Sequence, residues 1–477
     1  MKRALCFLLL AGVSAGSFAA PVSAETLREA LAKAYQTNPT LTGSRAGLRA
    51  ADENVPIAKA RGLPSVDVSG QFTENLLISS TNFFSPTRNI SARANLSIPI
   101  YQGGAVKNAI RAADARVGVG QANLRSTETN IFASVVGAYV DVLRDEAILG
   151  LNIKQVQVLD TNLQATRDRF EVGDLTRTDI AQSESRLAVA KSQLQSAEAQ
   201  LVSSRERYVQ LVGTEPGKLE QPPLFPNMPA TPDMAVEKSL ANNPELQSAR
   251  KASEAAGFDV RAARSARLPR VAAVADSSYA NFLNSAPASS RTNTSKSSSA
   301  GIQFSIPLYQ GGAPSAQVRQ AQARSAQAFE LVIEAERAVI AQTRSAFASL
   351  RATNAVIQSS ETAVSAAALS LEGVRAENSV GNRTILDILN AEQELLNAQV
   401  QLVSARRNAY VAGFNLLAAM GQAEADDLGL DGGTLYDPQI NAARVRSHIW
   451  DWGADPDPVP IATRTVDTQP QNPSIKP

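Results

Sequence analysis

Cysteine and histidine are almost missing from this sequence. Cys6 is the only cysteine among 477 residues, and His448 is the only histidine. One cysteine cannot form a disulfide within the chain, and a Cys/His cluster for a metal ion is equally excluded. A lone histidine in a polar, proline-rich segment is usually solvated, so we expect no metal site and no cofactor.

Neither sign of charge is in excess, since 46 Lys and Arg stand against 45 Asp and Glu. This balance argues against nucleic acid as a partner. Aromatic residues make up only 5% of the chain, while Ala, Gln and Ser are abundant. That mixture favours long solvated helices over one large core, and the length predicts two or three domains.

Long apolar runs are missing beyond the N-terminus. Lys2 and Arg3 precede an apolar stretch from Leu5 to Val13 and the small residues Val22-Ser23-Ala24. This order predicts a signal peptide, residues 1–24, removed after Ala24. The alternative, an N-terminal membrane anchor, is disfavoured because the apolar stretch is too short to span a bilayer. Any membrane span in the rest of the chain must therefore be built of β-strands.

An internal repeat organises the sequence. SIPIYQGGA at 97–105 returns as SIPLYQGGA at 305–313, and VGDLTRTD at 172–179 returns as VGNRTILD at 380–387. TNPTL at 37–41 matches NNPEL at 242–246. The shared order predicts two copies of one unit. We divide the chain into a first repeat (25–212), a Pro-rich linker (213–232), a second repeat (233–421) and a Pro-rich, partly disordered tail (422–477).

Each repeat is expected to contain a helical stretch followed by a β-hairpin. The helical stretches are Thr26 to about Lys59 and Met234 to about Arg264, and the hairpins cover about 65–100 and 269–308. In NISARANLSIPI, apolar residues alternate with polar ones from Ile90 to Ile100. About 10 alternating residues suit a transmembrane β-strand, but a soluble sheet with one wet face explains the same pattern.

Long helices follow each hairpin. Ala105 to Glu171 and Ala313 to Asn378 contain almost no helix breakers, and further helices are expected from about Arg177 to Val212 and Ile385 to Met420. A plain coiled coil or filament is the alternative for such Ala-rich helices. We also expect Trp450 and Trp452 of the tail to pack on the middle of this helical body.

The repeated nine-residue phrase stands where a strand must become a helix. Proline cannot donate to a sheet ladder, so we expect strand pairing to end at it. Tyrosine suits a membrane–water boundary, and a glycine pair permits a sharp turn. These roles fall on Pro99, Tyr101, Gly103 and Gly104, and on Pro307, Tyr309, Gly311 and Gly312. Four strands per chain cannot close a sheet in lipid, so a membrane protein of this kind must be an oligomer. Two chains would supply about eight strands and three about twelve.

Over about 25–421 the sequence resembles the TolC family of outer-membrane efflux and secretion channels. The residues that carry the resemblance are IPIYQGG and IPLYQGG, the two NP motifs, and the segments VGDLTRTD and VGNRTILD. The resemblance implies an α+β membrane protein. In a homotrimer, each chain would contribute four strands to a 12-stranded outer-membrane β-barrel, continued by a long periplasmic α-helical barrel. It further implies the outer membrane of a Gram-negative bacterium, outer-membrane lipid, a periplasmic adaptor (membrane fusion) protein and an inner-membrane transporter of RND, ABC or MFS type.

The segments 172–179 and 380–387 also have the local sequence pattern of a turn between two helices, which we call a helix tip. Gly173 and Gly381 suit left-handed helix ends, and capping boxes join Thr176 to Asp179 and Thr384 to Asp387. The resemblance implies a gate at these tips. It implies that Arg383 bonds to Thr178 and Asp179 of a neighbouring tip, and that Asp387 lines the entrance. Three copies of Asp387 would repel and take up protons or cations more readily than isolated Asp. Asn378 and Asn390 replace the family's gate tyrosine and second entrance aspartate, which implies a weaker gate.

The function that these patterns favour is a passive channel-tunnel of an efflux pump or type I secretion system. An enzyme is disfavoured because no phosphate loop, metal cluster or nucleophile elbow is present. A periplasmic structural coiled-coil protein without a pore remains the alternative. Drugs, small molecules and proteins remain open as cargo.

Overall fold

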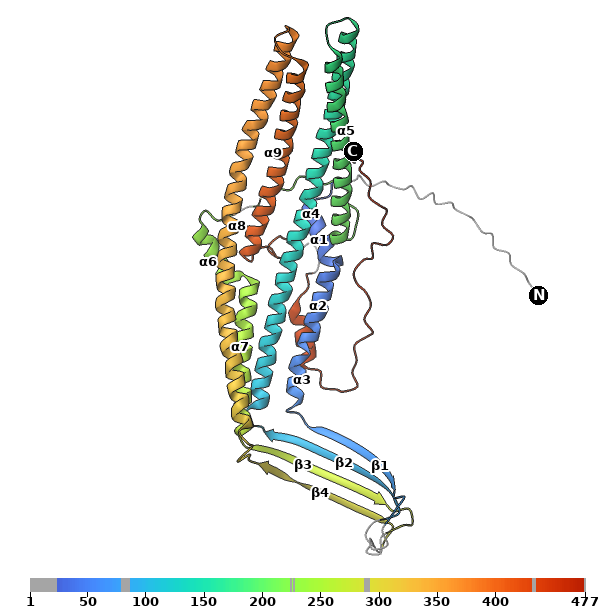
Figure 1. Cartoon of the computed structure of the whole chain (residues 1–477). Helices are drawn as coiled ribbons and strands as arrows, with labels where there is room; N and C mark the ends of the chain where they lie inside the picture. Colours follow the sequence, from blue (N-terminus) through green and yellow to red (C-terminus); the bar gives the residue numbers. More distant parts are fainter. Residues whose placement is uncertain are drawn as a thin grey trace, which may run out of the picture.

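The computed structural model describes residues 24–78, 86–223, 225, 228–286, 292–430 and 435–475. The predicted signal peptide lies outside these residues except for Ala24. Figure 1 shows an elongated helical body with a sheet at one end and two helical tips at the other. This shape separates the strand-to-helix junctions from the tips by the full length of the long helices.

Short helices line the part of the body next to the sheet. The first repeat has α1 (Leu27–Thr37), α2 (Pro39–Asp52) and α3 (Asn54–Ala60), and the second has α6 (Pro232–Asn242), α7 (Pro244–Arg264) and a 3₁₀ turn, Ser265–Arg267. The two NP motifs explain why each helical stretch is interrupted. Asn38 caps α2 and donates from Nδ2 to the carbonyl of Leu211 at 2.9 Å. Asn243 caps α7 and donates in the same way to Ala419 at 3.1 Å. Each motif therefore starts one helix and binds the C-terminal end of another.

The sheet is antiparallel and has the order β1-β2-β3-β4. Its strands are β1 (Ser65–Glu74), β2 (Arg88–Tyr101), β3 (Arg270–Asn281) and β4 (Thr294–Ser305). β2 pairs with β3, so the hairpins of the two repeats form one sheet. The register gathers mainly apolar residues on one face, among them the row of Val66, Leu96, Ala275 and Ala300. The next row, on the other face, is polar: Asp67, Asn95, Asp276 and Ser299.

The two repeats end their hairpins differently. β4 ends at Ser305, so Ile306 and Leu308 lie outside the strand, although we expected the hairpin to reach about 308. β2 continues through Pro99 to Tyr101, with a bulge opposite Ala272 and Val271, so the prediction that pairing ends at Pro99 is wrong. The reason is position: β2 has neighbours on both edges, whereas β4 is an edge strand that Pro307 cannot extend.

Four helices build the long part of the body. α4 (Ala105–Glu171) and α8 (Ala313–Ser379) have 67 residues each, which corresponds to about 100 Å. α5 (Arg177–Val212) and α9 (Ile385–Ala419) fold back along them. The main core lies where α1, α4 and α5 meet, around the fully buried side chains of Phe132, Tyr139 and Tyr208.

The tail contacts the body through residues other than those we expected. Trp450 and Trp452 are 71% and 87% exposed, so the predicted packing of these side chains is wrong within this chain. Instead, α10 (Pro438–Arg446) lies against α2, where Asn441 Nδ2 donates to Asp52 Oδ2 at 2.7 Å. The end of the tail covers Arg205, whose guanidinium is buried and donates to the carbonyl of Ser474 at 2.8 Å. Polar anchoring thus replaces the aromatic packing.

Candidate functional site

The first helix tip is a short turn between α4 and α5. Gly173 has φ +89°, a left-handed conformation that only glycine adopts without strain. The amide of Asp174 donates to the carbonyl of Arg169 at 2.9 Å and closes the end of α4. Thr176 and Asp179 then cap α5 reciprocally, as the sequence pattern predicted.

The second tip, between α8 and α9, uses the same turn with added side-chain bonds. Gly381 has φ +84°, and Thr384 and Asp387 form the capping box. Asn378 Nδ2 donates to the carbonyl of Arg383 at 2.7 Å. Arg383 Nε donates to Glu377 Oε2, also at 2.7 Å. The tip is therefore stabilised within its own chain, and Asn378 contributes to the turn itself.

The capping bonds determine the electrostatics of the two aspartates. Hydrogen bonds from the backbone N–H and the hydroxyl of Thr384 lower the pKa of Asp387 below its usual value, and Arg383 adds to this effect. Thr176 lowers the pKa of Asp179 in the same way. Within one chain, the expected easier proton uptake by Asp387 is therefore opposed by the cap.

The structure gives Asn390 a partner that sequence reasoning missed. Arg186 of α5 donates from Nη2 to Asn390 Oδ1 at 2.7 Å. Beneath this bond, Leu389 is buried against Leu163 of α4 and Leu187 of α5. The pair α8/α9 is thus joined to the pair α4/α5 near the tips, within one chain. Arg383, in contrast, contacts Glu377 of its own tip, and its predicted contact with Thr178 or Asp179 of a neighbouring tip stays a prediction.

A repeated ion pair also escaped the sequence analysis. Arg167 Nη2 lies 2.7 Å from Glu184 Oε1 and joins α4 to α5 below the first tip. At the equivalent positions of the second repeat, Arg375 pairs with Glu392, whose side chain is buried. In each pair, the arginine and the glutamate are 17 residues apart in sequence. Aligning the two repeats would have shown that the Arg and the Glu of this ion pair both recur at equivalent positions.

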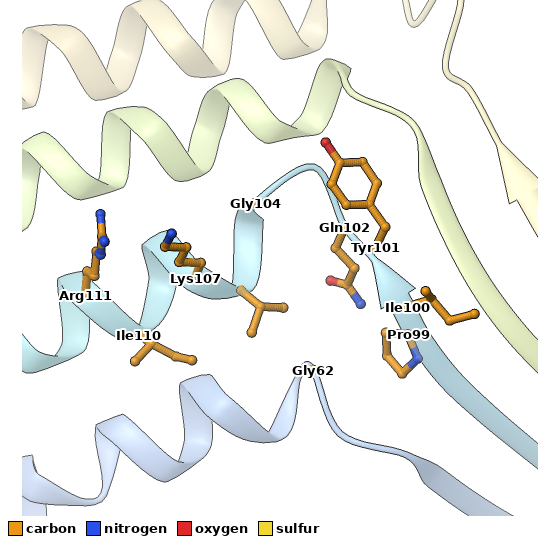
Figure 2. A pocket seen from close by; sticks show the side chains of 10 residues that line it. Gly62, Pro99, Ile100, Tyr101, Gln102, Gly104, Lys107, Ile110 and Arg111 are labelled. Carbon is orange, nitrogen blue, oxygen red and sulfur yellow. The ribbon is translucent and has the colours of Figure 1, made fainter.

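The strand-to-helix junction forms a second candidate region at the opposite end of the helices. Gly103 and Gly104 have φ +62° and +82°, and Gly311 and Gly312 have +59° and +80°. A cavity of about 520 Å³ opens beside the first junction. Figure 2 shows Tyr101 and Arg111 pointing toward the yellow-green ribbon of α7, whereas Ile110 points toward α3.

The described residues contain no cluster of three or more acidic, His or Cys side chains arranged to bind a metal ion. Across the same described ranges, none of the helices has both the length and the apolar character needed to cross a membrane.

The sequence profile described as "Outer membrane efflux protein" matches residues 30–214 and 235–422. The chain belongs to this family. The match falls in two segments that correspond to the two repeats. With the family comes a location in the outer membrane, as the resemblance implied.

Curated relatives agree with the family assignment. The outer membrane efflux protein BepC of Brucella suis biovar 1 (strain 1330) is 34% identical over 85% of this chain and 87% of its own length. The outer membrane protein TolC of Escherichia coli (strain K12) is 26% identical over 98% of this chain and 97% of its own. The alkaline protease secretion protein AprF of Pseudomonas aeruginosa is 29% identical over 69% and 70%. Relatives named for efflux and for secretion thus both match most of the chain.

Solved structures show the same fold. The outer membrane protein VceC of Vibrio cholerae superposes with a TM-score of 0.71 at 22% identity, over 83% of this chain and 96% of its own. The outer membrane channel CmeC of Campylobacter jejuni gives a TM-score of 0.73 at 16% identity, over 88% and 89%. The fold of a single chain is therefore that of outer-membrane channels.

Proposed function

We propose that three copies of this chain form a channel-tunnel that passively exports molecules from the periplasm, or from an inner-membrane pump, to the exterior. The sheet carries this proposal. Val66, Val68 and Phe72 of β1 and Ile302 and Phe304 of β4 are exposed large apolar side chains that share one face. Such a face suits lipid, while the opposite, polar face suits a water-filled interior.

The free strand edges support the trimer. Among the residues that the structure describes, β1 pairs only with β2 and β4 only with β3, so one edge of each outer strand lacks a partner there. Unpaired backbone groups are costly in lipid, and pairing β1 of one copy with β4 of the next would satisfy them. Three copies would close a sheet of twelve strands, a number that leaves room for a pore.

The helices would then continue the conduit through the periplasm, with the tips at its entrance. We propose Arg383, Asp387 and the Thr178-Asp179 tip as parts of this entrance, with Asn378 and Asn390 as stabilising residues. We also propose that the tips bind a periplasmic adaptor and that an inner-membrane transporter supplies the cargo. Relatives named for efflux and for protease secretion support both an efflux and a secretion role. In this proposal the chain has no catalytic activity.

The mass of the detergent-extracted protein and the conductance of planar bilayers test the proposal together. We expect a trimer and discrete, voltage-stable conductance steps. A monodisperse monomer without conductance would overturn the proposal. The alternative, a structural coiled-coil protein, predicts instead that the native protein leaves the membrane fraction without detergent.

A further inference from the structure

The strand-to-helix junctions carry a concentration of positive charge that the channel function does not use. In the first repeat, residues 57–66 and 99–113 contain Lys59, Arg61, Lys107 and Arg111, and no Asp or Glu. All four side chains are exposed. These residues lie at the end of α3 and the start of α4, next to the first residues of β1 and the last of β2.

The second repeat adds to the same end of the helices. Residues 260–275 contain four arginines and no acidic residue, and residues 306–323 contain one more. They lie around the turn from α7 into β3 and on the first two turns of α8: Arg261, Arg264, Arg267, Arg270 and Arg319. A chain with balanced charge overall thus gathers nine cations in four adjoining acid-free segments, which we call the basic collar.

Asp67 and Asp276 border the collar on the polar face of the sheet, opposite its apolar face. Two further bordering carboxylates pair with arginines outside the collar. Asp259, one residue before the arginine-rich segment, pairs with Arg116. Asp114, one residue after the α4 segment, lies 2.7 Å from Arg446 of α10. Neither carboxylate is therefore available to the collar. Its charge remains open to an external anion.

Two collar arginines from different repeats meet on one aromatic ring. The guanidinium carbon of Arg111 lies 5.7 Å from the ring centroid of Phe258, and that of Arg261 lies 4.2 Å from it. Both cations are held by the ring face rather than by a carboxylate. An anion placed beside them would relieve their mutual repulsion.

The cavity at the first junction combines this charge with apolar surface. Ile100, Val106 and Ile110 line it together with Lys107 and Arg111. Tyr101 also lines the cavity, and the bulge pairs it with Val271, which shares the apolar face of the sheet with Ala273. An aromatic ring and cations directly beside a lipid-facing surface mark the level of phospholipid headgroups.

We propose that the basic collar binds the phosphate headgroups of anionic glycerophospholipids in the leaflet of the outer membrane that faces the periplasm. The inference rests on the proposed function, because the trimer places the apolar face of the sheet in lipid. Lys107 and Arg111 contact the phosphate, and Ile100 and Tyr101 contact the upper part of the acyl chains. The site fixes the depth of the channel in the membrane.

Reconstitution of the full-length protein in nanodiscs of equal parts phosphatidylglycerol and phosphatidylethanolamine tests the proposal. Native mass spectrometry of the released protein counts the lipids that remain bound. We expect phosphatidylglycerol to be enriched over the nanodisc composition. The double variant Lys107→Gln/Arg111→Gln should lose enrichment several-fold, since each cation near an anionic surface contributes about a fivefold factor in affinity.

Two matched variants control this experiment. Lys107→Arg/Arg111→Lys keeps both charges and should retain the enrichment. Lys154→Gln/Lys191→Gln removes two exposed cations from α4 and α5, far from the collar, and should also retain it. Enrichment should decline between about 0.1 M and about 1 M salt, as the Debye length falls from about 10 to about 3 Å.

Several results would overturn the proposal. One is that the parent shows no enrichment of phosphatidylglycerol. Another is that Lys154→Gln/Lys191→Gln loses as much enrichment as Lys107→Gln/Arg111→Gln. A third is that free glycerol phosphate displaces the lipid. A change of ion selectivity in the Lys107→Gln/Arg111→Gln channel without a change in bound lipid would place these cations in the conduit instead. A conducting trimer without enrichment refutes only the lipid site, whereas a monomer without conductance refutes the channel itself.

Discussion

Arg186 of α5 donates a 2.7 Å hydrogen bond from Nη2 to Oδ1 of Asn390 on α9, across 204 residues of sequence. Together with the buried side chain of Leu389, this bond joins the two helical hairpins of one chain near their tips. Outward movement of α8 and α9 relative to α4 and α5 would break this contact. The two residues therefore form an intrachain tie whose strength should influence how far the entrance opens.

Weakening or strengthening the tie should change the conductance in opposite directions. Asn390→Leu removes the acceptor, and we expect a several-fold higher open probability, since an exposed hydrogen bond contributes about 0.5–1.5 kcal/mol. Asn390→Asp replaces it with an ion pair to Arg186 and should lower the conductance. Single-channel recordings measure both effects. In the double variant Arg186→Gln/Asn390→Asp the ion pair cannot form, so the conductance should no longer be lowered. Equal conductance in all variants would show that the tie does not limit opening.

The glycine pairs at the junctions should differ in their tolerance of a side chain. A Cβ at Gly103 would lie 2.6 Å from Leu268 Cβ and 3.0 Å from the carbonyl oxygen of Ser265, whereas a Cβ at Gly311 meets nothing within 4 Å. Both positions have positive φ, which costs a non-glycine residue about 1–2 kcal/mol.

We therefore expect Gly103→Ala to lower the yield of inserted trimer strongly, because its clash lies within one chain. Replacing both glycines of either junction with Val should block assembly. Quantification of trimer in outer-membrane fractions measures these effects. An unchanged yield for Gly103→Ala would contradict the steric argument.

Glu128 makes the attachment of the turn after α9 dependent on pH. Its Oε1 accepts the amide of Ala425 at 2.6 Å, and burial raises the pKa of this carboxyl to about 7. Because the folded pKa is above the usual value, the folded state binds the extra proton between about pH 4.5 and 7, and stability falls as pH rises through that range.

We expect hydrogen exchange at Ala425 and its neighbours to accelerate, beyond the intrinsic dependence, as pH rises from 5 to about 8. Glu128→Gln keeps the shape without the charge and should abolish this additional dependence. The variant Glu237→Gln, at an exposed side chain of α6, serves as the control. An unchanged pH profile in Glu128→Gln would show that another group titrates there.

Local signals explain why the long helices and tips could be predicted. α4 starts directly after Gly104 and ends just before Gly173, and Thr176 starts α5. Each of these signals acts within a few residues, so a single sequence displays it. The end of β4 could not be read in this way, because the neighbouring strand, rather than the local phrase, determines where pairing stops.

Contacts between distant segments were beyond sequence reasoning. No local sequence signal relates Arg186 to Asn390. From the sequence, Asn390 indicated only that the carboxylate of the family's second entrance aspartate is missing. The tail shows the same limit: Trp450 and Trp452 suggested packing, but Arg205 binds the tail through backbone carbonyls, which leave no sequence pattern. The repeated pairs Arg167–Glu184 and Arg375–Glu392 are different, since the internal repeat already contained them.

Asp387 has two roles that separate variants can distinguish. Its carboxylate caps α9 by accepting from the amide and hydroxyl of Thr384 at 2.9 and 2.8 Å. In the proposed trimer, three such charges would also ring the entrance and attract cations. Asp387→Ala removes both the cap and the charge, whereas Asp387→Asn removes the charge and keeps a side chain that can still accept a hydrogen bond.

We expect both variants to relieve block by multivalent cations added from the periplasmic side. Only Asp387→Ala should accelerate hydrogen exchange at the first turn of α9. In the parent, the capping bonds hold the pKa of Asp387 below its usual value, so the cap is intact at neutral pH and is lost only as pH falls through that lowered pKa. The equivalent Asp179→Ala and Asp179→Asn variants at the first tip provide the matched comparison for the cap. Cations could block the Asp387→Asn channel as strongly as the parent, while hydrogen exchange at the first turn of α9 accelerates in Asp387→Ala. Asp387 would then be a helix cap alone, and the cation site would lie elsewhere.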